Sequence, residues 1–295
     1  MIYQIKDLLA PAYQHILERH GRGKDLSIKS LPELDNKIWG FSKQKLVIIG
    51  GRPSNGKSAC MVQFAMDFAK QHKKILFFSL EMTKQTIMER IISLECRIDN
   101  FLLFTGQIIN KPDEQKKIAE LNDIVKNINF VVSDTIGKTF DEIFKIMEEM
   151  DTDIDAVFID YIQMIRNIGA TKKEAIDDYI KKLREFAIRK NFCAVVASQI
   201  NRGTHNSAKI TSPNLWELKS SGDLEEHSDM VILLHYPGQY DEAEGKRYFL
   251  NVAKNRDGRT GEIECTFEAK HGRISEGYVH PEENPDRDKE TRYSY

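Results

Sequence analysis

The chain has 295 residues, with 43 Lys and Arg against 45 Asp and Glu, which gives a formal net charge of −2. This balance excludes a strongly basic tail protein, so any nucleic-acid binding requires a local cluster of Lys and Arg. Hydrophobic residues at 41% and charged residues at 30% are typical of a folded chain with one large domain or two modest ones.

The first predicted element is an amino-terminal helix. Apolar residues from Ile5 to Leu17 recur at helical spacing, and Pro11 should either kink this helix or begin a second one at its first turn. A single apolar stripe has no core of its own, so the helix needs a partner. Residues 21–30, with two glycines and mixed charges, are predicted to form a linker. The chain shows neither a signal peptide nor a membrane span, which predicts a cytoplasmic protein with no membrane partner.

From residue 45 onward, short apolar runs alternate with amphipathic segments. The predicted buried strands are 46–49, 75–78, 130–132, 156–159, 194–197 and 231–234. The predicted helices between them are 58–71, 85–96, 113–126, 140–150 and 175–190. This alternation predicts an α/β fold with a doubly wound, mostly parallel sheet, which binds ligands at the carboxyl ends of its strands.

The carboxyl-terminal part follows a different pattern. Two alternating runs, 248–253 and 262–267, flank a polar stretch and predict an antiparallel hairpin with a long tip over 254–261. Residues 278–295 are rich in charge and proline and are predicted to be a disordered tail. The predicted organisation is a helix and connector over 1–25, one α/β domain over 26–277, and this tail.

The strongest chemical signal is a phosphate loop. Its residues are Gly51, Arg52, Pro53, Ser54, Asn55, Gly56, Lys57 and Ser58, which fit the pattern G-x-x-x-x-G-K-[ST]. The stretch follows a predicted strand and opens a predicted helix, the context that this motif requires. Backbone N–H groups up to Ala59 can cradle phosphates, Lys57 can reach the β- and γ-phosphates, and Ser58 can coordinate Mg²⁺. The sequence therefore predicts a nucleotide-binding site.

Three predicted strands lead into polar residues at the same edge of the sheet. Asp160 ends one strand, where a carboxylate can hold Mg²⁺ beside the phosphate loop, although acidic residues also end strands without a catalytic role. Glu81 lies just beyond another strand and can polarise a water for attack on a γ-phosphate, or can simply cap a helix. Gln199 follows a third strand, and its amide can respond to a γ-phosphate. Three strands that each lead into a polar residue around one phosphate loop are difficult to explain by packing alone.

Together these motifs resemble those of the DnaB-type replicative DNA helicases. The stretches that carry the resemblance are 51–58, 79–82, 159–163, 198–202 and 254–258, in family order over about residues 1–275. The resemblance implies a RecA-like P-loop ATPase domain with ATP and Mg²⁺ as its nucleotide and metal. It also implies a homohexameric ring that translocates on single-stranded DNA and unwinds duplex during DNA replication.

The resemblance also assigns roles to single positions. Lys57, Ser58 and Asp160 would hold nucleotide and Mg²⁺. Glu81 would be the catalytic base, and Gln199 would sense the γ-phosphate. Arg256 would be an arginine finger that reaches the neighbouring subunit's ATP, with Lys254 beside it to neutralise charge. From composition alone, residues 254–258 would be a solvated basic turn. A finger supplied by a neighbour implies that an isolated monomer hydrolyses ATP slowly.

DNA contact is implied for two loops. Where the family has Leu-Arg-Glu-Ser-Gly, this chain has Leu218-Lys219-Ser220-Ser221-Gly222. Lys219 can meet a phosphate as a point charge without the bidentate geometry of Arg, while Ser220, Ser221 and Gly222 remain phosphate donors. The second loop is expected within 166–173, with Arg166, Lys172 and Lys173 as candidates, although a charge run is usually a solvated surface.

The amino-terminal part departs from the family pattern. Family members usually carry a globular domain before a linker helix that packs on the adjacent subunit. This chain reaches a segment like that helix almost at once. The expectation is a helicase motor without the N-terminal domain, which leaves recruitment of a primase or helicase loader, and the stability of the ring, open.

The favoured interpretation is an ATP-dependent helicase motor. A water activated by Glu81 would attack in line a γ-phosphate held by Lys57, Mg²⁺ and the neighbour's Arg256. One alternative is a RecA-like recombinase or clock-type ATPase ring, which shares the phosphate loop but is disfavoured by the hairpin at 254–258. The other is a helicase-accessory protein that binds nucleotide and joins a ring without unwinding DNA.

Overall fold

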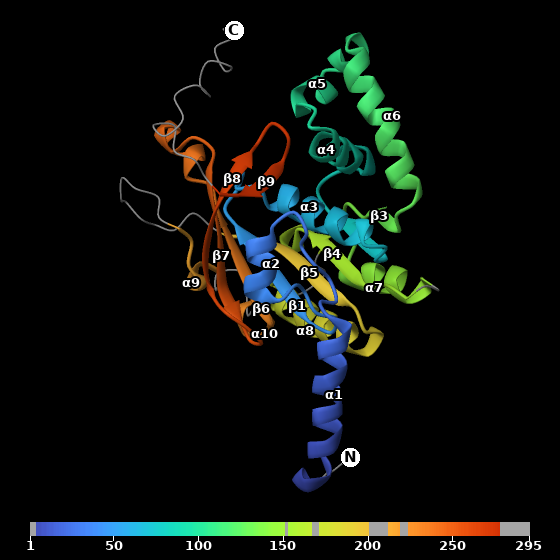
Figure 1. The fold of residues 1–295 in the computed structure, drawn as a ribbon, viewed down its shortest axis with the longest axis vertical. Coiled ribbons are helices and arrows are strands. Elements are labelled where there is room, and N and C mark those ends of the chain that lie inside the picture. Colours follow the sequence, from blue (N-terminus) through green and yellow to red (C-terminus); the bar gives the residue numbers. More distant parts are fainter. Residues whose placement is uncertain (1–3, 151–152, 167–170, 201–211, 219–223, 278–295) are drawn as a thin grey trace.

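The computed structural model describes residues 4–150, 153–166, 171–200, 212–218 and 224–277 (Figure 1). The predicted tail 278–295 and the loop residues 219–222 lie outside this part of the chain. The described residues contain one nine-stranded sheet with helices on both faces. This is the α/β architecture that the alternation of apolar runs predicts.

The sheet has the strand order β3-β2-β4-β5-β1-β6-β7-β8-β9. Its strands are β1 (Leu46–Gly51), β2 (Ile75–Ser79), β3 (Phe130–Asp134), β4 (Ala156–Asp160), β5 (Cys193–Gln199), β6 (Met230–His235), β7 (Arg247–Asn255), β8 (Gly261–Glu268) and β9 (Arg273–Glu276). Strands β1 to β6 pair in parallel, and β7, β8 and β9 add antiparallel pairs beside β6. Every predicted strand is present, whereas β9 is too short to give a recognisable alternating pattern and was not predicted.

Helices form a layer on each face of this sheet. One face is covered by α2 (Pro32–Ile38), α3 (Lys57–Lys70) and α4 (Lys84–Cys96), and the other by α7 (Phe140–Glu149) and α8 (Lys172–Lys190). Helices α5 (Asn100–Phe104) and α6 (Pro112–Lys126) lie beyond α4, and the short α9 (Leu215–Leu218) and α10 (Leu224–His227) lie near the antiparallel strands (Figure 1). The short helices α2, α5, α9 and α10 were not predicted.

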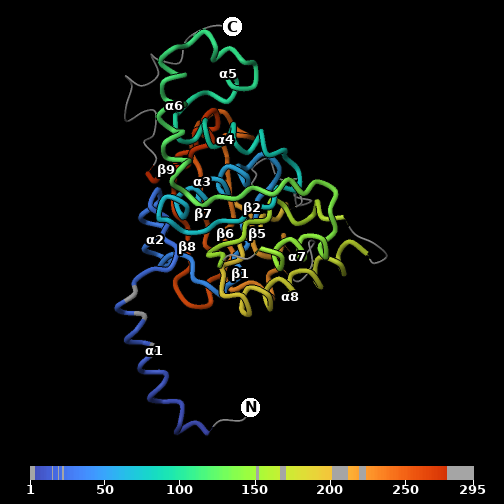
Figure 2. Tube along the Cα trace, turned by 90° about the vertical axis from the view of Figure 1, so that its right-hand side faces the viewer, coloured from blue at the N-terminus to red at the C-terminus, as the bar shows by residue number. Residues whose placement is uncertain are grey.

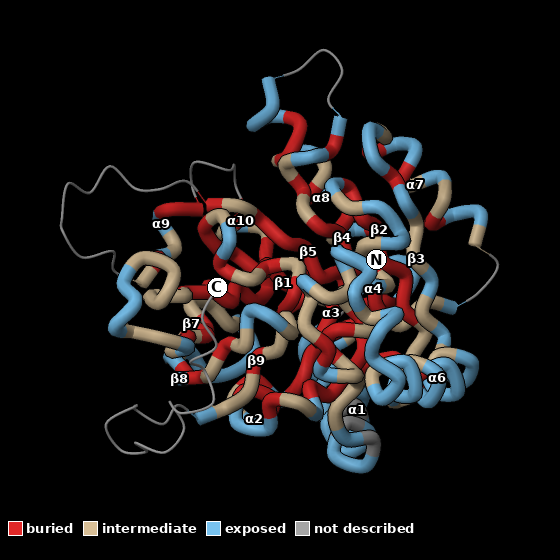
Figure 3. The backbone as a smooth tube through the Cα atoms, turned by 90° about the horizontal axis from the view of Figure 1, so that it is seen from above, coloured by how far each residue is buried: buried red, intermediate tan, exposed pale blue. Residues whose placement is uncertain are grey.

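The parallel strands are buried on both faces, as their unbroken apolar runs predict. In β1, Val47 and Ile49 pack in the core beneath α2, α3 and α4, whereas Leu46 and Ile48 pack in the core beneath α7 and α8. Figure 3 shows these buried strands at the centre of the molecule with exposed helices around them. Side chains at the strand ends are therefore positioned by a rigid scaffold.

The amino-terminal helix α1 (Leu9–Arg22) extends away from the body of the molecule (Figures 1 and 2). It follows a 3₁₀ turn at Ile5–Asp7, and Pro11 lies in its first turn, where an N–H would have no helical partner. The second of the two outcomes predicted for Pro11 is thus confirmed. The apolar side chains of this segment are exposed, with Leu9 at 76% and Ile16 at 59%.

The prediction of a linker over 21–30 is wrong in its second half. Leu26 and Ile28 are fully buried, and Leu26 forms an antiparallel bridge with Phe41. These two apolar residues stand alone among polar ones, so only the rest of the fold provides the core that covers them.

The predicted extent of the hairpin tip is also wrong. Strand β7 continues through Lys254 to Asn255, because β6 pairs with it up to that point. Lys254 is therefore a strand residue, and the tip begins at Arg256. No helix in the described ranges is both long and apolar enough to cross a membrane.

Candidate nucleotide-binding site

The phosphate loop connects β1 to α3 at the carboxyl edge of the parallel strands. Its backbone turns sharply, with φ of 60° at Ser54 and 75° at Gly56. A Cβ on Gly56 would also lie 3.0 Å from Cζ of Phe267, so both the backbone and the neighbouring strand favour glycine there. The loop geometry is therefore built into the fold through contacts with the antiparallel strands.

Asn55 joins this loop to the chain that follows β6. Its side-chain amide donates to Gln239 Oε1 (2.8 Å) and to the hydroxyl of Tyr240 (3.2 Å), and its Oδ1 accepts from the N–H of Tyr236 (2.9 Å). The Tyr248 hydroxyl donates to the Asn55 carbonyl (2.7 Å). These bonds hold the loop in one conformation before any ligand contributes.

Lys57 begins α3 and directs its ammonium back into the loop. Its Nζ donates to the carbonyl of Arg52 at 3.0 Å. Burial lowers the pKa of Lys57 to about 8, against the opposing attraction of Asp160 and Glu81. The three predicted groups are thus close enough to interact, and the ammonium can exchange a carbonyl partner for phosphate oxygens.

Asp160 is 1% exposed at the end of β4. Neither of its carboxylate oxygens has a hydrogen-bond partner of ordinary geometry within the described residues. Burial raises the pKa of Asp160 to about 6, and the nearby Ser58 hydroxyl and Lys57 ammonium oppose that rise. The buried carboxylate is thus only partly compensated, and a bound cation can complete its compensation.

These residues fit Mg²⁺. Magnesium prefers oxygen ligands and is usually bound by one or two carboxylates together with substrate phosphates. Asp160 and Ser58 supply a carboxylate and a hydroxyl of this kind beside the phosphate loop. The described residues contain no cluster of His, Cys, Asp and Glu that would suit a metal held by protein ligands alone.

Glu81 and Gln199 flank the same edge, as predicted. Ser79 pairs with Asp160 in the sheet, and Glu81 follows two residues later with its side chain exposed. Gln199 pairs with Gly51 at the start of the phosphate loop. The sheet thus brings together the ends of β1, β2, β4 and β5, and Lys57 and Ser58 open α3 beside these ends.

Comparison with known proteins identifies the family of this domain. Residues 28–276 match the family described as the DnaB-like helicase C terminal domain. The chain belongs to this family. A probable replicative DNA helicase of Trieres chinensis is 32% identical over 255 residues, which cover 81% of this chain and 54% of that protein. The replicative DNA helicase DnaC of Bacillus subtilis is 26% identical over 280 residues, covering 92% and 61% respectively.

Solved structures confirm the RecA-like fold expected for a DnaB-like domain. The ATPase domain of G40P superposes with a TM-score of 0.83 at 22% identity, covering 94% of this chain and all of that one. A DnaB-like replicative helicase, solved in a study of its interactions with primase, superposes with a TM-score of 0.82 over 94% of this chain and 68% of that one. The chain spans between half and two thirds of the length of the two curated relatives named above.

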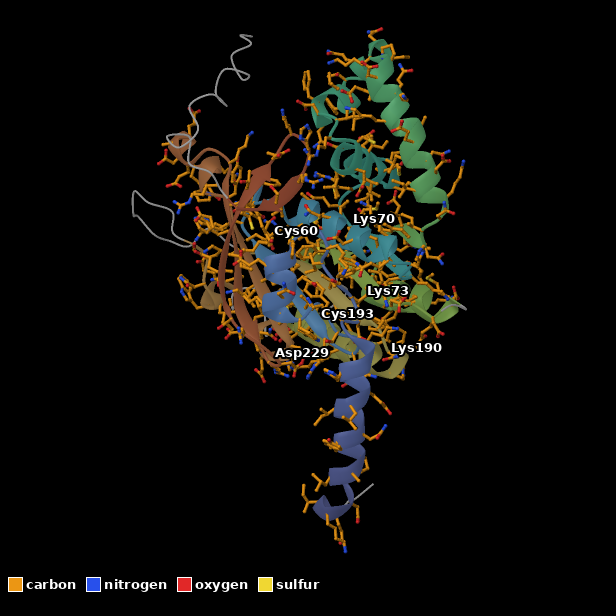
Figure 4. The ribbon with its side chains drawn as sticks, in the orientation of Figure 1. Cys60, Lys70, Lys73, Lys190, Cys193 and Asp229 are labelled. Atoms are coloured by element: carbon orange, nitrogen blue, oxygen red, sulfur yellow. The ribbon has the colours of Figure 1, made fainter. Side chains whose placement is uncertain are left out.

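The expected arginine finger of this DnaB-like domain lies at the opposite, amino edge of the sheet. The N–H of Arg256 donates to the carbonyl of Asp229 (2.9 Å), and the Asp229 carboxylate accepts from the N–H of Leu46, the first residue of β1 (3.0 Å). The phosphate loop follows the other end of β1, roughly 17 Å away along the strand. Figure 4 shows Asp229 at the lower end of the sheet, well below Cys60 near the start of α3. Arg256 and the phosphate loop of one chain are therefore not brought together.

Lys254 and Arg256 both cap α10. The Arg256 guanidinium donates to the Glu226 carbonyl (2.7 Å) and approaches the Asp229 carboxylate at 3.5 Å. The Lys254 ammonium donates to the carbonyls of Glu225 and Glu226. Burial, and then the charge of Arg256, lower the pKa of Lys254. The two predicted catalytic cations thus lie side by side, with the Arg256 side chain 41% exposed.

The predicted DNA residues are only partly within the described chain. Arg166 is exposed, and its N–H donates to the carbonyl of Lys138 (3.1 Å). Lys172 and Lys173 are exposed in the first turn of α8, which begins earlier than predicted because Thr171 and Glu174 form a capping box. Residues 219–222 lie outside the described part. The roles of all these residues in DNA binding remain predictions.

Two contacts of the candidate functional residues are not predicted from the sequence. Arg52 was predicted only as a loop residue, yet its side chain forms a buried ion pair with Glu217. Asp229, which supports Arg256, was not singled out at all. Glu217 immediately precedes the matched stretch that begins at Leu218, so its position was a usable signal; nothing in the local sequence marks Asp229.

Proposed function

We propose that this chain is the motor of an ATP-dependent replicative DNA helicase, which forms a homohexameric ring and translocates on single-stranded DNA. The observation that carries the proposal is the composite phosphate site, in which Lys57, Asp160 and Glu81 interact beside a phosphate loop of the DnaB-like family. Family membership favours this function over a recombinase or a clock-type ring.

In the proposed reaction, the Lys57 ammonium leaves the Arg52 carbonyl and donates hydrogen bonds to the β- and γ-phosphates of ATP. Asp160 and Ser58 would hold Mg²⁺, which would supply positive charge beside the phosphates. Glu81 accepts a proton from the attacking water, and its exposure at the end of β2 leaves room for that water. Gln199, at the end of β5, is placed to sense the γ-phosphate.

The arginine finger must come from another copy of the chain. Arg256 is roughly a strand length from its own phosphate loop, which supports catalysis at an interface between subunits. The exposed apolar residues of α1 favour the same assembly, because they need a surface that the described part of their own chain does not offer. A ring would place the amino edge of one copy against the carboxyl edge of the next.

The interactions with DNA and with other proteins belong to the proposal. Lys219, Ser220, Ser221 and Gly222 would contact the DNA backbone, and Arg166, Lys172 and Lys173 would line a second loop. A primase and a helicase loader are candidate partners. The DnaB-like replicative helicase that shares this fold interacts with primase, which supports a primase as a partner of this chain.

The first test is the ATPase rate per subunit as a function of protein concentration, with and without single-stranded DNA at a stated salt concentration. The proposal predicts a rate that rises with concentration, because each site needs a neighbour, and that DNA stimulates. A rate that neither concentration nor DNA changes would contradict it. A strand-displacement assay then separates a helicase from an accessory protein that joins a ring without unwinding.

A further inference from the structure

A buried ion pair joins the phosphate loop to helix α9. The Nη2 atom of Arg52 donates to both carboxylate oxygens of Glu217, at 3.0 and 3.3 Å. The two side chains are only 5% and 3% exposed. Glu217 Oε1 also accepts from the N–H of Asn214 (3.1 Å), at the turn that begins α9. The pair therefore links the second residue of the phosphate loop to a helix far along the sequence.

A close apolar contact holds the same helix against the end of β1. A Cβ on Gly50 would lie 2.7 Å from a methyl group of Leu233 and 3.4 Å from one of Leu218, so glycine allows this close approach. On another side, Leu215 and Trp216 line a cavity of about 740 Å³. Helix α9 is thus attached to the phosphate loop and β1 on one side and borders open space on another.

The backbone that carries Arg52 is itself bonded to the nucleotide-site lysine. The Arg52 carbonyl accepts from the ammonium of Lys57 (3.0 Å) and from the N–H of Asn55 (3.2 Å). When the ammonium binds phosphate, the Arg52 carbonyl loses or shares this donor. Two steps then connect the nucleotide to Glu217: the Lys57–carbonyl bond and the Arg52–carboxylate pair.

Stability alone is a weak reason for such a pair. Removing two charges from water costs about as much as their attraction returns, and well-packed apolar side chains are often as stabilising at such a position. A charged pair differs from apolar packing in fixing one relative position of two segments. Here the two segments are the phosphate loop and the helix that ends at Leu218.

We propose that Glu217 is a positioning residue that transmits nucleotide occupancy from the phosphate loop, through Arg52, to α9 and to the chain that follows Leu218. The inference rests on the proposed function, because the family resemblance assigns residues 219–222 to DNA contact. Glu217 takes no part in hydrolysis. Its role is to make DNA binding and the ATPase rate depend on each other.

Glu217→Gln tests this role, because it keeps the shape of the side chain and removes its charge. Basal ATP hydrolysis and the Kd for nucleotide should stay within about twofold of wild type, while stimulation by single-stranded DNA falls about fivefold or more, the size of an ordinary coupling. The effect of a nonhydrolysable ATP analogue on DNA affinity should fall with it. A merely structural role would change stability and leave these ratios intact.

Asp35→Asn is the matched control. Asp35 lies on α2, away from the phosphate loop, and is also buried, with 5% of its surface exposed. Its carboxylate pairs with the Lys24 ammonium at 2.7 Å. This variant should lower the free energy of unfolding and leave DNA stimulation unchanged. Equal loss of stimulation in both variants would attribute the effect to general destabilisation and overturn the inference.

The remaining outcomes separate this inference from the proposed function. A wild-type ring that DNA does not stimulate overturns the proposed function, and this inference with it. A stimulated wild type with an equally stimulated Glu217→Gln overturns the inference alone. If Glu217→Gln does not fold, hydrogen exchange of the wild type decides: the ATP analogue must change amide exchange over 212–218, and unchanged exchange there refutes the coupling.

Discussion

The two edges of the parallel sheet carry similar charged groups in opposite electrostatic environments. At the carboxyl edge, the carboxylate of Asp160 is buried and neither oxygen accepts a hydrogen bond of ordinary geometry from the described residues. At the amino edge, the equally buried carboxylate of Asp229 binds the N–H of Leu46 and approaches the guanidinium groups of Arg184 (3.1 Å) and Arg256 (3.5 Å). The carboxylate of Asp160 is thus only partly compensated by its own chain, whereas the carboxylate of Asp229 is paired within it.

This difference distinguishes a ligand site from a structural support. An uncompensated buried charge is costly, so it is retained where a bound group compensates it. The amino edge is compensated by its own chain, yet it leaves the Arg256 side chain 41% exposed. A full catalytic unit would then combine the carboxyl edge of one copy with the amino edge of another.

The largest expected effect is on turnover, from the amino edge. Arg256→Ala should lower the rate of ATP hydrolysis by about 10³-fold or more, the usual contribution of an arginine finger, while nucleotide affinity measured with a fluorescent analogue stays near wild type. Arg247→Ala is the control, since Arg247 lies on the same strand and pairs with Glu264 on β8.

Mixing experiments sharpen this prediction. Lys57→Ala should lose nucleotide binding and hydrolysis, whereas mixed rings of Lys57→Ala and Arg256→Ala subunits should regain part of the rate. In such rings some sites combine an intact phosphate loop with an intact finger. Loss of nucleotide binding in Arg256→Ala, or mixed rings with no recovery, would refute the assignment of the finger.

The next effect separates function from stability at the carboxyl edge. Asp160→Asn should abolish Mg²⁺-dependent hydrolysis, yet raise the free energy of unfolding by roughly 1–3 kcal/mol at pH 7 without nucleotide. The reason is that the pKa of Asp160 is raised to about 6 in the folded state, so the ionised carboxylate opposes folding. For the same reason, the contribution of Asp160 to the stability of the wild type becomes less favourable as pH rises from about 4 to 6.

Urea unfolding measures this change, and Asp229→Asn gives the contrast. Asp229 is satisfied by its own chain, so the substitution should lower stability. If both variants change stability in the same direction, the proposed difference between the two edges is wrong.

A smaller effect concerns pH and stability beside the phosphate loop. His235 ends β6, and burial, followed by the charge of Arg52, lowers its pKa to about 4. The unfolded imidazole binds a proton near pH 6.5 and the folded one does not, so stability must fall as pH decreases between these values, by up to about 3 kcal/mol. His235→Phe should reduce the difference in unfolding free energy between pH 7 and pH 5, and an unchanged difference would contradict this.

The smallest expected effect is on assembly. Ile16→Ser removes an apolar side chain that is 59% exposed on α1, and it should raise the concentration needed for ring assembly by roughly tenfold if a neighbour buries it. Light scattering or native mass spectrometry measures the shift. Glu18→Ser on the same helix serves as the control, and an equal shift in both variants would indicate helix loss in place of a lost contact.

The strand ends of the nucleotide site were predictable because their signals are local. A buried parallel strand shows as a short apolar run, and the polar residue that follows it belongs to the carboxyl edge. This reasoning places Asp160 and Glu81 beside Lys57, which the phosphate-loop motif marks, and the structure gives the three groups a common electrostatic environment. The roles of these residues in catalysis stay predictions until they are tested.

Other features left no local signal. Leu26 and Ile28 are isolated apolar residues, so their burial depends on helices and strands distant in sequence. Lys254 has the composition of a turn, yet β6 extends the pairing of β7 to include it. The pairing of Arg52 with Glu217 also depends on the fold, because the two residues lie 165 positions apart; the sequence marks only the position of Glu217, next to the matched stretch.

By itself the sequence determined the fold class, the phosphate loop and the edge of the sheet that carries the nucleotide site, because each depends on periodicity or on spacing within a few residues. Only the tertiary structure decided which charges are compensated and which are not. Compensation depends on residues that meet across the fold, as Asp229 meets Leu46 and Arg184, and no local pattern specifies such a meeting. The same holds for the distance of Arg256 from its own phosphate loop, which follows from the length of β1 and is the reason that the proposed catalytic unit needs two chains.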